Sequence, residues 1–112
     1  MDSQMKKGMM EVCILSVLSR GDSYGYQLIK DIEPIMPLSE STLYPVLRRL
    51  EAAGSLTVYS VEHNSRLRKY YSITNEGRQR IADFLSEWAE VNRVYDFIAE
   101  VNGGVRSGRL DS

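Results

Sequence analysis

The segment that decides the fold reads STLYPVLRRLEAAG and occupies residues 41–54. Its large apolar residues follow the intervals i, i+3, i+4 and i+7, which places them along one face of a helix; they are Leu43, Val46, Leu47 and Leu50. Ser39 or Ser41 is suited to cap the start of this helix and Gly54 to end it. Pro45 cannot donate a hydrogen bond to the carbonyl of Ser41, so either the regular helix begins near Ser41 or its first turn is loosened.

The opposite face of this helix is polar. If the apolar stripe faces a core, Ser41, Tyr44 and Arg48 point away from it, and Arg49 lies on the flank. Hydroxyl groups followed one turn later by a guanidinium group can donate to phosphates and read base edges in a DNA major groove. The alternative interpretation is an ordinary solvated helix face.

Helical patterns also precede this segment. Residues 5–19 are apolar almost all round the predicted helix, so it must be covered on most sides, in part by a second subunit. Residues 24–33 form the next predicted helix, with Asp22 or Ser23 as its N-cap and Pro34 after its end. Together with the decisive helix, it predicts a helix-turn-helix.

The residues after Gly54 change to a strand pattern. Residues 55–62 and 67–74 alternate and are rich in Val, Thr and Tyr, which indicates a hairpin. Asn64, in the turn between them, is the candidate for a positive φ. Thr74 is the predicted cap of a last long helix. The order helix, helix, helix, hairpin, helix predicts a mainly α fold with a small β-hairpin: a winged helix-turn-helix followed by a long C-terminal helix.

The last helix carries a heptad pattern. Apolar residues are spaced 3, 4, 3, 4 and 3 along it, the spacing that packs one helix along another. These residues are Ile81, Phe84, Trp88, Val91, Tyr95 and Ile98. We therefore predict a DNA-binding domain over residues 1–74, a dimerisation helix over 75–102 and a flexible tail over 103–112.

Charge is distributed unevenly along the chain. The whole sequence has a net charge of −1, but residues 41–80 hold seven basic and three acidic residues, a net of +4, and the rest carries −5. Attraction to phosphate depends on the local patch, so an acidic chain with a basic central segment is compatible with DNA binding. A solvated basic surface is the alternative.

Other classes of protein find little support in the composition. The longest apolar stretch, residues 9–18, is about half the length that spans a bilayer, so we expect a cytoplasmic protein without a membrane partner. Cys13, the single cysteine, lies in an apolar helix where thiols are usually inert, and His63 is at the predicted hairpin tip. One His and one Cys cannot form a transition-metal site. We expect no enzyme activity, no metal and no cofactor.

Three stretches together resemble the hallmark segments of the PadR family. They are SYGYQL at residues 23–28, the decisive segment at 41–54, and RKYYSITNEG at 68–77, in the order and spacing of the family. The resemblance covers residues 5–100 and implies a cytoplasmic, dimeric transcriptional regulator, usually a repressor, of the compact kind with one C-terminal helix. The hairpin tip departs from the family, where it is often Gly-rich; here residues 63–67 read HNSRL.

The residue pattern and the resemblance together give the expected sites. The predicted DNA-binding residues are Tyr24, Ser41, Thr42, Tyr44, Arg48, Arg49, Arg66, Arg68 and Lys69. The predicted dimer contacts are the six heptad residues. The resemblance implies that some relatives sense phenolic or multidrug-like molecules, so Trp88, with Phe84 and Tyr95, is the hypothetical binding site of a small aromatic effector. Simple packing in the dimer is the alternative role of Trp88.

The leading functional hypothesis is therefore a homodimeric repressor. It would bind double-stranded DNA at an inverted-repeat operator and be released by a small aromatic ligand. The competing hypothesis is a winged-helix adaptor whose basic face binds an acidic protein partner.

Overall fold

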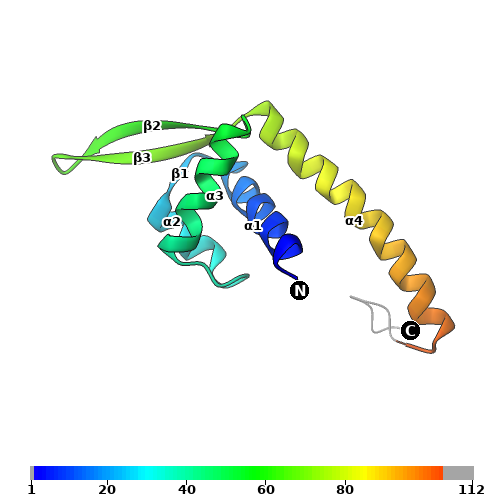
Figure 1. Ribbon diagram of the computed structural model, residues 1–112. Helices are drawn as coiled ribbons and strands as arrows, with labels where there is room; N and C mark the ends of the chain where they lie inside the picture. Colours follow the sequence, from blue (N-terminus) through cyan, green and yellow to red (C-terminus); the bar gives the residue numbers. More distant parts are fainter. Residues whose placement is uncertain (1, 105–112) are drawn as a thin grey trace. The chain divides into compact units, whose positions relative to one another are not determined.

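A computed structural model describes residues 2–104 of the chain (Figure 1). The elements are α1 (Ser3–Leu18), β1 (Ser23–Tyr24), α2 (Gly25–Ile32), α3 (Glu40–Ala52), β2 (Leu56–His63), β3 (Arg66–Ile73) and α4 (Asn75–Val101). The chain divides after Ile81 into two compact units. Most of the tail predicted over residues 103–112 lies outside the described residues. Across residues 2–104, no helix is long and apolar enough to cross a membrane.

The core of the first unit lies among α1, α2 and α3. The apolar stripe predicted for α3 is buried throughout, since none of its four residues is more than 4% exposed. It packs with Ile14 and Leu15 of α1 and with Leu28 of α2 in one hydrophobic cluster. Met9, Cys13 and Val17 of α1 are only partly buried against this cluster. The prediction that the apolar stripe of α3 faces a core is confirmed.

Helix α3 begins one residue before Ser41. Its N-cap is Ser39, whose hydroxyl bonds the Ser41 hydroxyl at 3.0 Å and makes no bond to the backbone. Because the helix starts at Glu40, Pro45 lies in its second turn, where only the carbonyl of Ser41 loses a donor. The helix ends as predicted: Gly54 has a φ of 80°, and the next amide, of Ser55, donates to the carbonyl of Leu50.

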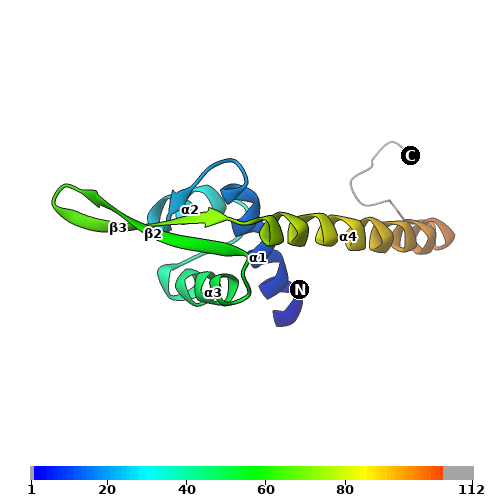
Figure 2. The same cartoon turned by 90° about the horizontal axis from the view of Figure 1, so that it is seen from above.

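The hairpin of β2 and β3 forms the wing, which projects beyond α2 and α3 in both views (Figures 1 and 2). Its register pairs Leu56 with Ile73 at one end and His63 with Arg66 at the other. Asn64 has a φ of 52°, as predicted, and Ser65 has a φ of 65°. Two consecutive positive φ values characterise the two-residue turn whose twist matches that of the flanking strands.

A third strand completes the sheet and corrects one prediction. β1 pairs antiparallel with β3, so the strand order is β1-β3-β2. A two-residue strand is too short to produce an alternating pattern, which is why the sequence did not reveal it. As a consequence, the N-cap of α2 is Tyr24, without a side-chain cap bond, rather than Asp22 or Ser23. The fold class, a winged helix-turn-helix followed by a long helix, is as predicted.

The start of α4 is joined tightly to the first unit. The Thr74 hydroxyl accepts a 3.1 Å hydrogen bond from the amide of Gly77 and donates at 2.6 Å to the carbonyl of Gly54. The predicted cap is thus confirmed. Gly77 is buried because the helix backbone passes directly over Ser55 at this point. A β-carbon at Gly77 would lie 2.3 Å from the Ser55 carbonyl oxygen and 2.7 Å from Ile73.

The substitution Gly77→Ala tests this junction. We expect it to lower the free energy of unfolding by about 2–3 kcal/mol, because the added methyl group meets the backbone carbonyl oxygen of Ser55, which cannot move aside. Gly8→Ala is the matched control, since a β-carbon at Gly8 would have no neighbour within 4 Å. That helical substitution should stabilise by about 0.5–1 kcal/mol. Urea unfolding at equal protein concentration compares them, and wild-type stability for Gly77→Ala would contradict the close approach.

Candidate nucleic-acid interface

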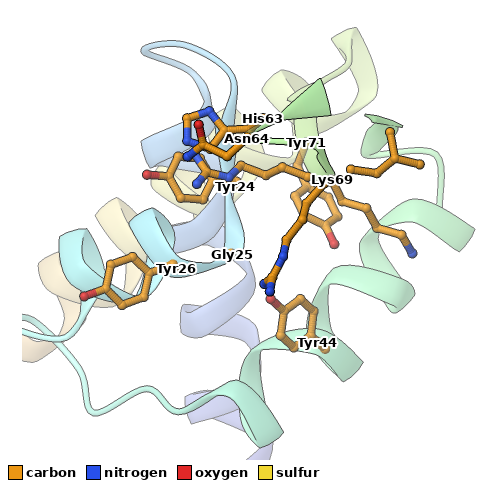
Figure 3. A pocket seen from close by; sticks show the side chains of 11 residues that line it. Tyr24, Gly25, Tyr26, Tyr44, His63, Asn64, Lys69 and Tyr71 are labelled. Atoms are coloured by element: carbon orange, nitrogen blue, oxygen red, sulfur yellow. The ribbon is translucent and has the colours of Figure 1, made fainter. Parts of the chain in front are cut away.

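A cleft of about 640 Å³ lies between the wing and the helices α2 and α3 (Figure 3). Its basic side chains all come from β3: Arg66, Arg68 and Lys69. Tyr24, at the β1–α2 junction, also lines the cleft. None of the described lining residues carries a carboxylate, so the cleft is suited to an anionic ligand.

Helix α3 lines this cleft through the side chain of Tyr44. Its hydroxyl lies so close to the first residue of α2 that a β-carbon on Gly25 would be 2.3 Å from it. Glycine at this position therefore gives the Tyr44 side chain its space. Sequence reasoning did not assign a role to Gly25, although it stands between two tyrosines in the stretch SYGYQL.

The two adjacent tyrosines of β3 have different environments. Tyr71 is 5% exposed and belongs to the core, whereas Tyr70 is half-buried. Burial raises the pKa of Tyr71, and the neighbouring Tyr44 and Glu51 raise it further. Because successive residues of a strand point to opposite faces, only one of the pair belongs to the core.

The two arginines of α3 also differ. Arg48 is exposed and lines a smaller hollow of about 180 Å³, together with Tyr44 and Lys69 of the main cleft. Arg49 instead donates through Nε to Oε2 of Glu11 on α1, at 3.3 Å. The neighbouring helix thus holds the guanidinium group on the flank of α3.

Arg49 lies in a second hollow, of about 360 Å³, at the other side of α3. Ser41 and Thr42, also predicted to bind DNA, line this hollow, as do Lys6 and Lys7 of α1. The structure therefore groups the predicted residues in two places. Five of them surround the wing cleft: Tyr24, Tyr44, Arg66, Arg68 and Lys69. Arg48 is linked to that cleft through Tyr44 and Lys69.

Along α4, the predicted heptad residues differ in exposure. Ile81, the first of them, packs partly buried against the core of the first unit. Val91, Tyr95 and Ile98 are each about half exposed in the single chain, at 46–54%. Phe84 and Trp88 contact each other, with ring centroids 6.0 Å apart and planes inclined by 40°.

The residues considered for catalysis or metal binding do not come together. Cys13 is partly buried, with its Sγ 3.9 Å from Sδ of Met36, and burial raises the pKa of its thiol. His63 lies at the end of β2, next to the wing turn. Within residues 2–104, no group of three or more His, Cys, Asp or Glu residues is arranged to hold a metal ion.

Comparison with known proteins identifies the family. The profile of the Transcriptional regulator PadR-like family matches residues 14–83. The transcriptional regulator YqjI of Escherichia coli is 33% identical over 90 residues, which are 77% of this chain but only 38% of YqjI.

Solved structures agree with this match. A transcriptional regulator from Clostridium thermocellum superposes with a TM-score of 0.75 at 34% identity, covering 84% of this chain and 96% of that one. A PadR-like transcriptional regulator from Bacillus cereus gives a TM-score of 0.73 at 30% identity, with 86% and 96% covered. Its fold, the three hallmark stretches and these matches show that the chain belongs to the PadR-like family of transcriptional regulators, which are not enzymes.

Proposed function

We propose that this protein is a homodimeric repressor that binds double-stranded DNA sequence-specifically at an inverted repeat. The observation that carries the proposal is the wing cleft, whose described lining is basic, free of carboxylates and next to the exposed face of α3. Repression follows from the expected mode of action, since a dimer bound over a promoter would exclude the transcription machinery.

In this proposal, α3 and the wing make different contacts with DNA. Helix α3 enters the major groove, where Arg48 reads base edges and the Tyr44 hydroxyl donates to a phosphate. The wing residues Arg66, Arg68 and Lys69 bind backbone phosphates beside the groove. Ser41 and Thr42, at the first turn of α3, contribute further hydroxyl donors on the other side.

The adaptor hypothesis uses the same surface for a different partner. An acidic protein would also be attracted to the basic cleft, and its binding would also weaken with salt. For duplex DNA, the logarithm of the affinity is expected to fall linearly with the logarithm of the salt concentration, because the basic residues that bind phosphates release condensed counterions. A preference for inverted-repeat duplexes over unrelated duplexes would favour the repressor.

Alanine substitutions of the basic residues test DNA binding. Arg48→Ala, Arg68→Ala and Lys69→Ala should each weaken the affinity for duplex DNA by about 1–3 kcal/mol, and the two wing variants should lower the salt slope by about 1. Arg20→Ala, in the loop after α1 and outside the cleft lining, is the matched control. Fluorescence anisotropy over a salt series measures both quantities. Unchanged affinity in all three variants would contradict the proposed DNA face.

The homodimer is proposed to form through α4. Many large apolar side chains of α4 are exposed in the single chain, including Leu85, Phe97 and Val101 at 62–67%. Exposed apolar side chains in such number on one helix indicate an interface. A second copy of α4 fits a heptad pattern, because the two seams are self-complementary.

Charges placed in the seam test this interface. Val91→Glu and Tyr95→Glu should give monomeric or insoluble protein, because burying an unpaired carboxylate costs far more than the apolar contact gains. Ser86→Glu, on the same helix but outside the heptad seam, should leave the oligomeric state unchanged. Sedimentation velocity distinguishes monomer from dimer. A folded wild-type monomer at micromolar concentration would rule out the α4 dimer.

Release by a small aromatic ligand is the last part of the proposal. The contact between Phe84 and Trp88 favours it, since adjacent rings offer a surface on which a planar compound can stack. Tyr95 follows about two helical turns after Trp88. Such a ligand would have to bind more tightly to a dimer geometry that cannot bind the operator. Each tenfold preference for that geometry shifts the equilibrium between the two geometries by about 1.4 kcal/mol.

Trp88 is the only tryptophan, so its fluorescence reports on this site directly. We expect planar aromatic compounds to quench it and to lower DNA affinity over the same concentration range, and Phe84→Ala to weaken both effects. Ser86→Ala, between these two residues in sequence, is the control. Quenching without a change in DNA affinity would mean that the ring pair binds ligands without regulating the protein.

A further inference from the structure

A row of tyrosine rings crosses the sheet beside the cleft. Tyr59 and Tyr70 are opposite each other in the register of β2 and β3, and their rings stack with centroids 5.7 Å apart and planes 17° apart. Tyr70 is also opposite Tyr24 in the register of β1 and β3, and these rings meet edge to face at 5.4 Å. The row therefore includes one ring from each of the three strands.

Hydrogen bonding holds the β2 end of this row. The Tyr59 hydroxyl donates to Oδ2 of Asp22 at 2.6 Å. The same bond raises the pKa of Tyr59, because it stabilises the protonated phenol that donates to Asp22. Asp22 directly precedes β1, so the bond ties β2 to the segment that carries Tyr24.

A guanidinium group covers the β1 end. Cζ of Arg68 lies 4.1 Å from the centroid of the Tyr24 ring. Arg68 and Tyr70 are two residues apart on β3 and share a face, which makes Arg68 the diagonal neighbour of Tyr24 across the strands. Tyr24 and Arg68 both line the cleft.

Arg68 is more buried than the other cations of the wing and contacts a ring. Its side chain is half-buried, whereas Arg66 and Lys69 are exposed. Within the described part of the chain, the cation–ring contacts are those of Arg68 with Tyr24 and of Lys30 with Tyr26, and none involves Arg66 or Lys69. Arg68 is thus the wing cation whose position is restrained before any ligand arrives.

We propose that Tyr24 is a positioning residue whose ring, rather than its hydroxyl, holds the Arg68 guanidinium in the cleft for a DNA phosphate. This inference rests on the proposed function and assigns Tyr24 an indirect part in it. A guanidinium held over a ring is already restrained, so it loses less conformational freedom when it binds a phosphate.

Separate removal of the ring and of the hydroxyl tests the role of Tyr24. Tyr24→Phe keeps the ring and should bind duplex DNA within about twofold of wild type, whereas Tyr24→Leu should bind about tenfold more weakly. Combined with Arg68→Ala, Tyr24→Leu should cause no further loss. Tyr26→Leu removes another ring of the same cleft, and its effect should add to that of Arg68→Ala.

Two outcomes of these binding measurements overturn the inference. An equal loss in Tyr24→Phe and Tyr24→Leu would show that the hydroxyl contacts DNA itself. Additive losses in the Tyr24→Leu/Arg68→Ala double variant would show that the two residues act independently.

The contact between Tyr24 and Arg68 can also be tested without DNA and without relying on the folding of the Tyr24→Leu variant. NMR spectroscopy of the wild type and of Tyr24→Phe provides this test. In the wild type and in Tyr24→Phe, the NMR resonance of Arg68 Nε–H should be shifted upfield by the ring current. A resonance at its ordinary position in both proteins would overturn the inference. Failure of the wild type to bind duplex DNA would instead contradict the proposed function itself, and this inference with it.

Discussion

The buried stripe of α3 is the constraint on which the other features depend. Leu43, Leu47 and Leu50 are each at most 2% exposed and lie in the cluster shared by α1 and α2. An α-helix repeats every 3.6 residues, so burying this face directs Tyr44 and Arg48 outward. The leucines that stabilise the fold by burial therefore also orient the side chains that we propose meet DNA.

The sheet forms the side of the cleft that faces α3, and it depends on the two-residue strand β1. A two-stranded hairpin alone is marginally stable in water. Here β1 adds a third strand, and the tyrosine row with the Asp22 hydrogen bond reinforces the pairing. Since Gly25 directly follows β1, the same pairing also sets where α2 begins and how closely Tyr44 approaches it.

One carboxylate joins three helices of the first unit. Glu11 of α1 is only 12% exposed and accepts hydrogen bonds from Arg49 of α3 and from Arg80 at the start of α4. A carboxylate so far from water is stable only when paired, which holds these guanidinium groups in place. Neighbouring arginines on α3 thus have separate surroundings, since Arg49 is held by α1 while Arg48 remains exposed.

The sequence by itself determined the features that depend on local periodicity and turn chemistry. These are the α3 stripe, the positive φ at Asn64, the cap at Thr74 and the heptad pattern of α4, because neighbours in sequence specify them. Only the tertiary structure decided that β1 exists, that Glu11 holds Arg49 and that Tyr24 lies under Arg68. Those contacts join residues 38 and more positions apart, and their partners become neighbours only when the strands and helices pack.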